Sequence, residues 1–284
     1  MELRSLGKTG MSVGVIGLGT VKLGRTRGLK HPPSPTLSAS GSLPGQVALP
    51  TDEQARALLS AAAELGINLI DTAPAYGTSE ERMGTLMHRH GWFGGRDRWV
   101  ICSKAGEEFD EEADDGHGSR GVSRFDFSPA AIRASAERSL SRLRTDRLDV
   151  LLAHSDGRDE WLIRESGAIG ELQNLKARGL IRAYGVSTKT VEGGLLAVEC
   201  SDVVMVTHNL THTIEQRVID AAQDADVGVL IKKGLESGHA ADPARAIRFV
   251  LATPGVTAMI VGTTNPEHLR ANVLAASPDG PRAR

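Results

Sequence analysis

Aromatic residues, cysteine and an excess of either charge are all scarce in this sequence of 284 residues. Aromatic residues make up 4% of it, which leaves few platforms on which the bases of single-stranded nucleic acid could stack. Lys and Arg total 33 and Asp and Glu total 35, so no net positive field attracts nucleic acid or an anionic membrane. Neither is therefore expected as a partner.

The two cysteines and the N-terminus each exclude a further class of protein. Cys102 and Cys200 form no CxxC or Cys/His pattern, so no metal site is expected, and free thiols indicate a reducing compartment. The apolar stretch in MELRSLGKTGMSVGVIGLG is short and broken by glycines, which predicts neither a signal peptide nor a membrane span. We expect a cytoplasmic protein, with its oligomeric state left open.

The remaining pattern is an alternation of short apolar runs with amphipathic helical stretches. Apolar residues make up 40% of the chain and charged residues 24%, as in an ordinary globular protein. Each predicted strand except the first is followed by a helix, which favours parallel strands covered by helices. The eight predicted strands contain Ile16, Ile70, Ile101, Leu151, Ala183, Val204, Leu230 and Ile260. Eight units predict an α/β fold of the (β/α)8 TIM barrel type, preceded by a small β-hairpin around Gly7–Gly10.

The predicted domain covers residues 1–276, and 277–284 are expected to form a flexible tail. Within the domain, 21–50 is a long loop rich in proline, serine and glycine, and whether it is ordered stays open. The segment 107–126 is predicted to be a charged loop. Its acidic residues, Glu107, Glu108, Asp110, Glu111 and Glu112, are expected to form a solvated face.

Polar residues follow three neighbouring predicted strands, at the end where such barrels carry their active sites. These residues are Asp71, Tyr76, Lys104 and His154. An ammonium group near a phenol favours the phenolate and lowers the phenol pKa from about 10. A carboxylate keeps that ammonium charged, and an imidazole can orient a carbonyl oxygen. The set suits proton delivery to a carbonyl oxygen, although an aldolase using Lys104 as a Schiff-base nucleophile stays an alternative.

Five segments carry a resemblance to a known family. INLIDTAPAYGTSEERMG, VICSKAG, LLAHSDG, YGVSTKTVEGG and MIVGTTNPEHLRANV resemble the aldo-keto reductase superfamily, in one of its shorter bacterial branches. The resemblance implies reduction of an aldehyde or ketone, a small-molecule substrate, with a nicotinamide cofactor. It also implies a catalytic tetrad in which Tyr76 is the general acid, Lys104 lowers its pKa, Asp71 supports Lys104 and His154 positions the carbonyl.

The same resemblance implies a cofactor site along the later strands. Its expected residues are Ser187, Thr188, Lys232, Lys233, Gly262, Thr263, Thr264, His268 and Asn272. NADPH is the expected cofactor, with NADH left open. Thr188 and Met205 replace an Asn and a Gln that are usual in the family, and the stacking aromatic residue after strand seven is missing. These departures keep open a second interpretation, a nucleotide-binding barrel with little or no turnover.

The substrate pocket is expected to be walled by the two long loops and a few large side chains. The predicted walls are residues 20–50, residues 107–126, Trp92, Phe109 and His208. The sequence does not identify the aldehyde or ketone.

Overall fold

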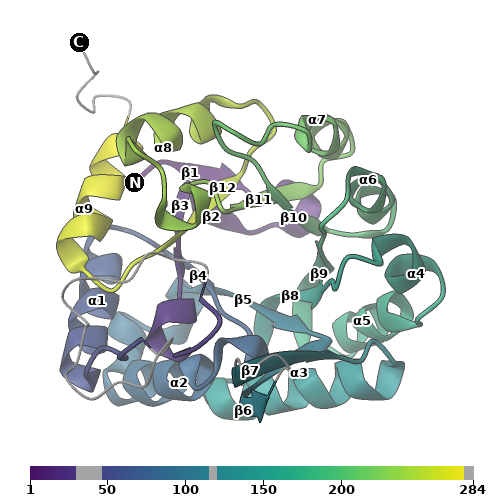
Figure 1. Ribbon diagram of the computed structural model, residues 1–284, viewed down its shortest axis with the longest axis horizontal. Helices are drawn as coiled ribbons and strands as arrows, with labels where there is room; N and C mark the ends of the chain where they lie inside the picture. Colours follow the sequence, from purple (N-terminus) through teal and green to yellow (C-terminus); the bar gives the residue numbers. More distant parts are fainter. Residues whose placement is uncertain (30–46, 115–119, 278–284) are drawn as a thin grey trace.

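The computed structural model describes residues 1–29, 47–114 and 120–277, and its centre is a closed ring of parallel strands (Figure 1). Around the ring the order is β10-β11-β12-β3-β4-β5-β8-β9. The strands are β3 (Ile16–Gly19), β4 (Leu69–Asp71), β5 (Val100–Ala105), β8 (Leu148–His154), β9 (Ile181–Ser187), β10 (Val203–Thr207), β11 (Gly228–Lys232) and β12 (Ala258–Gly262). The predicted TIM barrel and its eight strands are confirmed.

Helices surround the ring and cover its outer face (Figure 1). They are α1 (Asp52–Glu64), α2 (Ser79–Arg89), α3 (Pro129–Leu143), α4 (Asp159–Arg164), α5 (Ala168–Ala177), α6 (Val191–Cys200), α7 (Gln216–Asp224), α8 (Pro243–Ala252) and α9 (Pro266–Ala275). Their starts follow the local sequence: Thr51 and Gln54 form a capping box on α1, and Ser128 and Asp242 cap helices that begin with proline.

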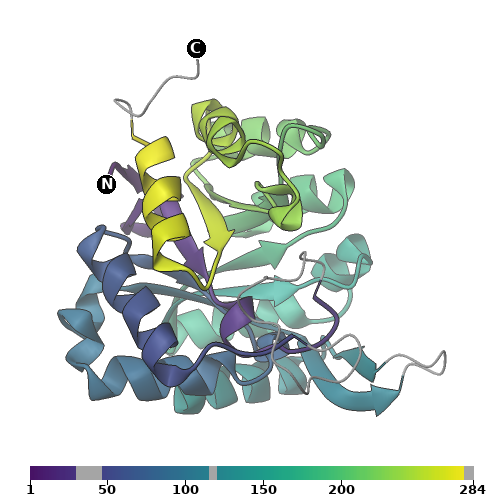
Figure 2. The same cartoon turned by 60° about the vertical axis from the view of Figure 1, so that its left-hand side comes forward.

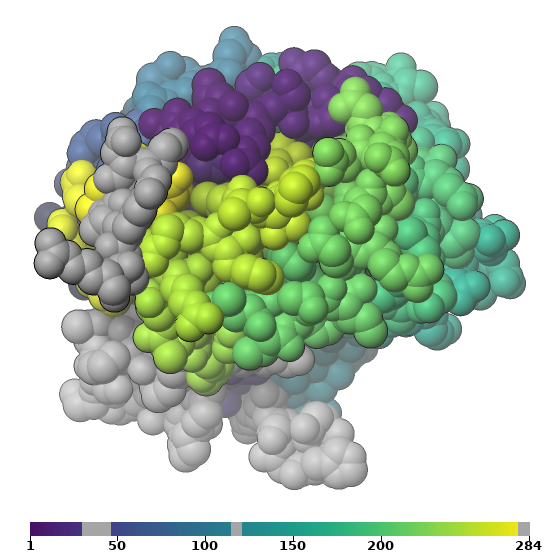
Figure 3. Space-filling view, turned by 90° about the horizontal axis from the view of Figure 1, so that it is seen from above, coloured from purple at the N-terminus to yellow at the C-terminus, as the bar shows by residue number. Residues whose placement is uncertain are grey.

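The N-terminal hairpin closes one end of the barrel. It consists of β1 (Leu3–Ser5), the 3-10 turn η1 (Gly7–Thr9) and β2 (Ser12–Gly14). Leu6, Met11 and Val13 belong to the same buried cluster as the residues that point into the barrel, among them Leu69 and Met205. Figure 3 shows the purple N-terminal segment beside the yellow C-terminal part of the chain, where Arg4 donates to the carbonyl oxygens of residues 251 and 256. Among the described residues, this hairpin covers one end of the ring and leaves uncovered the other end, where the strands finish.

Segment 107–126 is not the loop that we predicted. It contains an antiparallel hairpin, β6 (Glu107–Asp114) and β7 (Arg120–Phe125), which projects from the barrel in Figure 2. The described part of the predicted loop 21–50 contains a 3-10 turn, η2 (Val21–Leu23). Residues 30–46 of that loop, and 278–284 of the predicted tail, lie outside the described residues. In the described ranges no helix is both long and apolar enough to span a lipid bilayer.

The turn of the N-terminal hairpin generates a prediction about stability. Gly7 has φ +50°, and a Cβ there would lie 2.4 Å from the backbone nitrogen of Gly228. Gly7→Ala should therefore lower the free energy of unfolding by about 3 kcal/mol, from left-handed strain plus steric overlap. Gly10 also has a positive φ but nothing within 4 Å, so Gly10→Ala should cost only about 1 kcal/mol. Urea unfolding measures both, and equal losses would contradict close packing of this turn against β11.

Candidate active site

The four predicted catalytic side chains lie together at the carboxyl ends of neighbouring strands. Asp71 is the last residue of β4, Lys104 lies near the end of β5, and His154 is the last residue of β8. Tyr76 belongs to the 3-10 turn η4 (Pro74–Tyr76), which follows β4 directly. The parallel register keeps these ends level, because Asp71 pairs with Cys102 in β5.

The centre of this group is an ion pair between Lys104 and Asp71. Lys104 Nζ lies 2.6 Å from Asp71 Oδ1 and donates a second hydrogen bond, of 2.9 Å, to the carbonyl oxygen of Thr72. The two side chains are only 1% and 5% exposed. Burial alone would lower the pKa of Lys104, but Asp71 and Tyr76 outweigh burial and raise it. Lys104 therefore stays an ammonium ion, which argues against the aldolase alternative because a Schiff base needs a neutral amine.

Tyr76 lies against this ion pair. Its hydroxyl is 3.5 Å from Asp71 Oδ2, and Lys104 Nζ lies 4.8 Å from the centroid of its ring. Burial raises the pKa of Tyr76 to about 12, although Lys104 acts in the opposite direction. Lys104 lowers the pKa of Tyr76, as expected from the sequence, but burial outweighs the neighbouring ammonium and the net shift is upward. Tyr76 is a protonated phenol at neutral pH, and hence a proton donor.

The turn that carries Tyr76 is fixed by close backbone packing. Gly77 has φ +60°, and a Cβ there would lie 2.2 Å from the carbonyl oxygen of Gly24. That same oxygen accepts a 3.2 Å hydrogen bond from the backbone nitrogen of Thr78. Residues after β3 therefore hold the Tyr76 turn against the rim of the barrel.

His154 meets a carboxylate that we had not predicted to take part. Its Nδ1 lies 2.6 Å from Glu107 Oε2 without the alignment of a hydrogen bond, and the contact is an ion pair when the imidazole is protonated. Glu107 also accepts a 2.5 Å hydrogen bond from Ser123 Oγ. Burial would raise the pKa of Glu107, but His154, Ser123 and Arg25 lower it to about 2. Burial lowers the pKa of His154, an effect that Glu107 opposes.

The acidic segment is therefore not the solvated face that we expected. Glu107 faces the site with 11% of its side chain exposed, and Glu111 accepts hydrogen bonds from the backbone nitrogen and hydroxyl of Thr26. Glu108, by contrast, pairs with Arg138 and is 43% exposed. The position of Glu107, three residues after a predicted catalytic lysine, was the one sequence feature that could have identified it.

Two of the predicted walls meet over the open end of the barrel, and two single residues were placed wrongly. Arg25 stacks on Phe109 at 3.5 Å, so the segment after β3 contacts hairpin β6–β7. Trp92 follows α2 and accepts a hydrogen bond from Trp99, just before β5, which places it at the opposite end of the barrel. His208 stacks on Phe249 of α8 and bonds to Thr253, so it packs outside the ring.

Part of the predicted cofactor site forms one cluster at the ends of β9 and β11. Lys232 Nζ donates to Ser187 Oγ at 3.0 Å and to the carbonyl oxygen of Thr188 at 2.5 Å. Burial and the neighbouring Lys233 lower the pKa of Lys232 to about 8, against an opposing effect of Glu215. Thr188 Oγ1 is buried with no hydrogen-bond partner in the described parts of the chain. An orphaned hydroxyl beside these donors fits a bound amide, as in nicotinamide.

The other predicted cofactor residues lie around the start of α9. Gly262 ends β12, Thr263 and Thr264 lie between β12 and this helix, and Asn265 caps the helix through a 2.8 Å hydrogen bond from the backbone nitrogen of Glu267. His268 is exposed in the first turn. Asn272 is buried one turn further along the same face. A helix start of this kind favours an anion such as phosphate.

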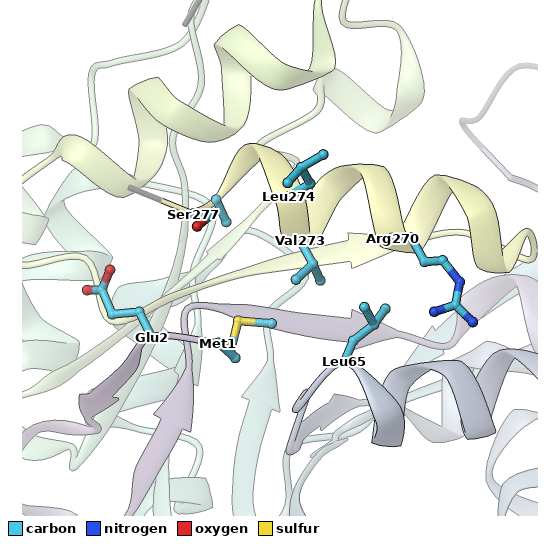
Figure 4. Close-up of a pocket in the computed structure, with 8 residues that line it drawn as sticks. Met1, Glu2, Leu65, Arg270, Val273, Leu274 and Ser277 are labelled. Carbon is cyan, nitrogen blue, oxygen red and sulfur yellow. The ribbon is translucent and has the colours of Figure 1, made fainter. Parts of the chain in front are cut away.

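A separate pocket of about 430 Å³ lies away from all these residues (Figure 4). It is lined by Met1, Glu2, Leu65, Arg270, Val273, Leu274, Ala276 and Ser277. Its walls come from the N-terminus, the end of α1 and the outer face of α9, and it contains no predicted site residue.

Known proteins share both the fold and much of the sequence. The model of the Aldo/keto reductase family matches residues 39–245. A solved structure of a Pseudomonas aeruginosa protein assigned to the aldo-keto reductases is 47% identical, with a TM-score of 0.80 over 96% of this chain and 93% of that one. The curated relative D-threo-aldose 1-dehydrogenase from Pseudomonas sp is 27% identical over 282 residues, which cover 80% of this chain and 84% of the relative. The NADH-specific methylglyoxal reductase of Escherichia coli is 26% identical over 245 residues, covering 84% of this chain and 68% of the relative.

The barrel fold and the matched relatives define the class: barrel oxidoreductases that act on carbonyl groups. The chain belongs to the aldo/keto reductase family. It is an NAD(P)H-dependent carbonyl oxidoreductase, and hence an enzyme rather than a binding barrel without turnover.

The buried ion pair generates a prediction that needs no substrate. Asp71→Asn leaves the Lys104 ammonium buried without its counter-ion, which should lower the free energy of unfolding by about 3 kcal/mol or more. The exposed pair of Glu64 and Arg270 is the control, and Glu64→Gln should change stability by less than about 1 kcal/mol. Denaturant unfolding at pH 7 measures both. Equal small losses would mean that the Lys104 charge does not depend on Asp71.

Proposed function

We propose that the protein reduces an aldehyde or ketone to an alcohol with NADPH, and that Tyr76 donates the proton. One observation carries this proposal: a protonated phenol lies against a buried ammonium–carboxylate pair at the open end of the barrel. A carbonyl oxygen that gains negative charge needs such a donor and such a cation beside it.

Each residue of the tetrad has a distinct task in this proposal. Tyr76 gives its phenolic proton to the carbonyl oxygen as the carbon–oxygen double bond is reduced, and the phenolate that results is stabilised by the Lys104 ammonium. Asp71 keeps Lys104 charged and in place. His154, edge-on to the Tyr76 ring at a centroid distance of 6.5 Å, orients the carbonyl. The nicotinamide, when bound, supplies the hydride.

We assign cofactor binding to the two groups at the ends of the later strands. Ser187, Thr188 and Lys232 would hold the nicotinamide end, because the free hydroxyl of Thr188 needs a partner. Lys233, Gly262, Thr263, Thr264, His268 and Asn272 would hold the phosphates and the adenosine. NADPH is our choice over NADH, although one relative is named as specific for NADH.

The substrate that we favour is a small polar carbonyl compound. The names of relatives include an aldose dehydrogenase and a methylglyoxal reductase, so aldoses and dicarbonyls are the first compounds to test. The cytoplasmic location, the lack of a nucleic-acid or membrane partner and the domain bounds 1–276 stay predictions from the sequence.

The role of Tyr76 has a matched control in the chain, since the sequence contains two tyrosines. Tyr76→Phe should lower kcat for carbonyl reduction by about 100-fold or more, because the proton donor is lost. The affinity for NADPH, measured by fluorescence titration, should change by less than about threefold. Tyr184 bonds to Gln173 outside the barrel, so Tyr184→Phe should keep full activity. A Tyr76→Phe enzyme as fast as wild type would remove the phenol from the mechanism.

Lys232 provides a separate test of the cofactor site. Lys232→Met removes the ammonium that holds Ser187 and Thr188, and it should weaken binding of NADPH about tenfold or more in the same titration. Lys8 lies exposed in the hairpin at the closed end, so Lys8→Met should leave binding unchanged. A parallel titration with NADH determines the preference between the two cofactors. Unchanged affinity in Lys232→Met would move the nicotinamide site elsewhere.

A further inference from the structure

Glu107 is a half-buried carboxylate at the active site to which the tetrad assigns no task. It comes from hairpin β6–β7, not from a barrel strand, and its Oε2 lies 2.6 Å from Nδ1 of His154. Ser123 in the second strand of the same hairpin donates a 2.5 Å hydrogen bond to Oε1, which holds the carboxylate in place. The hairpin thus delivers a fixed negative charge to one ring nitrogen of His154.

The other groups that face His154 do not supply this charge. Lys104 from β5 and Lys232 from β11 both act against a positive charge on the imidazole ring. Tyr76 from η4 lies nearly perpendicular to the imidazole ring, at an interplanar angle of 84°, and stays neutral at ordinary pH. Arg25 acts on Glu107 and keeps it ionised. Among these groups, Glu107 is therefore the anion that opposes the effect of Lys104 and Lys232 on the pKa of His154.

We propose that Glu107 is a positioning residue for carbonyl reduction, which keeps a proton on Nδ1 of His154 and leaves Nε2 to meet the substrate. The inference rests on the proposed function of the tetrad. A carboxylate oxygen at 2.6 Å repels a ring nitrogen that presents a lone pair and attracts one that carries hydrogen. Nδ1 is buried beside Glu107, whereas 19% of the His154 side chain as a whole is exposed.

This arrangement links the charge of His154 to the rate of carbonyl reduction. With Nδ1 protonated, the neutral ring has only a lone pair on Nε2, which cannot donate a hydrogen bond to a carbonyl oxygen. The imidazolium form carries hydrogen on both nitrogens, and its Nε2–H orients the carbonyl while Tyr76 transfers the proton. Reduction should therefore decline as the pH rises through the pKa of His154. Glu107 moves that decline to higher pH, because its negative charge stabilises the imidazolium.

Glu107→Gln tests this role by removing the charge while keeping the size and shape of the side chain. The pH at which kcat/KM for reduction begins to fall should move about one unit lower. On the falling limb, kcat/KM should drop about tenfold relative to wild type at the same pH. Since the pKa of Tyr76 is about 12, its own titration lies above this range.

Two control variants distinguish the effect of the Glu107 charge from the effect of its size and position. Glu108→Gln neutralises the adjacent carboxylate, which pairs with Arg138 instead, and should leave the pH profile in place. Glu107→Asp keeps the charge on a shorter side chain and should move the profile by less than half as much as Glu107→Gln. Equal displacement by Glu107→Asp and Glu107→Gln would overturn the electrostatic role of Glu107.

A direct measurement distinguishes failure of this inference from failure of the proposed function. In protein labelled with ¹⁵N-histidine, the shifts of His154 should report hydrogen on Nδ1 in the neutral ring, and a pKa that falls in Glu107→Gln. Hydrogen on Nε2 instead, or an unchanged pKa, would overturn the role of Glu107 even in an active enzyme. If the shifts behave as expected but Tyr76→Phe keeps full activity, Glu107 still controls His154 and the tetrad mechanism is what fails.

Discussion

The ion pair of Lys104 and Asp71 is the constraint on which the rest of the active site depends. Two charges are removed from water at the inner rim of the barrel, where their 2.6 Å contact, the carbonyl oxygen of Thr72 and the hydroxyl of Tyr76 replace the lost hydration. The pairing register of β4 and β5 brings them to the same level, so the ring of strands fixes the ion pair. The Lys104 ammonium beside the Tyr76 ring is therefore placed by a barrel strand and not by a loop.

The two ends of the barrel have different tasks. At the closed end, the N-terminal hairpin fills the interior with the apolar side chains of Leu6, Met11 and Val13, and Arg4 fastens it through hydrogen bonds to backbone carbonyl oxygens. At the open end, buried polar groups accumulate, among them Thr188 with an orphaned hydroxyl. A bound cofactor would supply the partner that the Thr188 hydroxyl lacks, and so would offset the cost of burying that group.

Residues whose positions follow the alternation of the strands could be predicted. Residues whose roles depend on how burial and neighbouring charges compete in the folded structure could not. Asp71, Lys104 and His154 follow apolar runs, so the ends of the runs located them. The same alternation would have excluded His208 from the walls of the pocket, because Met205 points into the barrel and a residue three positions further along points out.

The pKa of Tyr76 depends on how far burial outweighs Lys104, which no sequence pattern records. Glu107 was missed because Gly106, at φ +94°, turns the chain out of the strand period, and the acidic run that follows resembles a hydrated surface.

Hairpin β6–β7 contributes both to the wall of the pocket and to the charge beside His154. Its Phe109 forms part of the wall with Arg25, Glu111 anchors Thr26 from the opposite wall, and Glu107 contacts His154. The barrel strands contribute none of these three side chains. A chimeric enzyme that received this hairpin from a relative would acquire a new pocket shape and a new histidine protonation range together, so selectivity and working pH would be inherited as a single module.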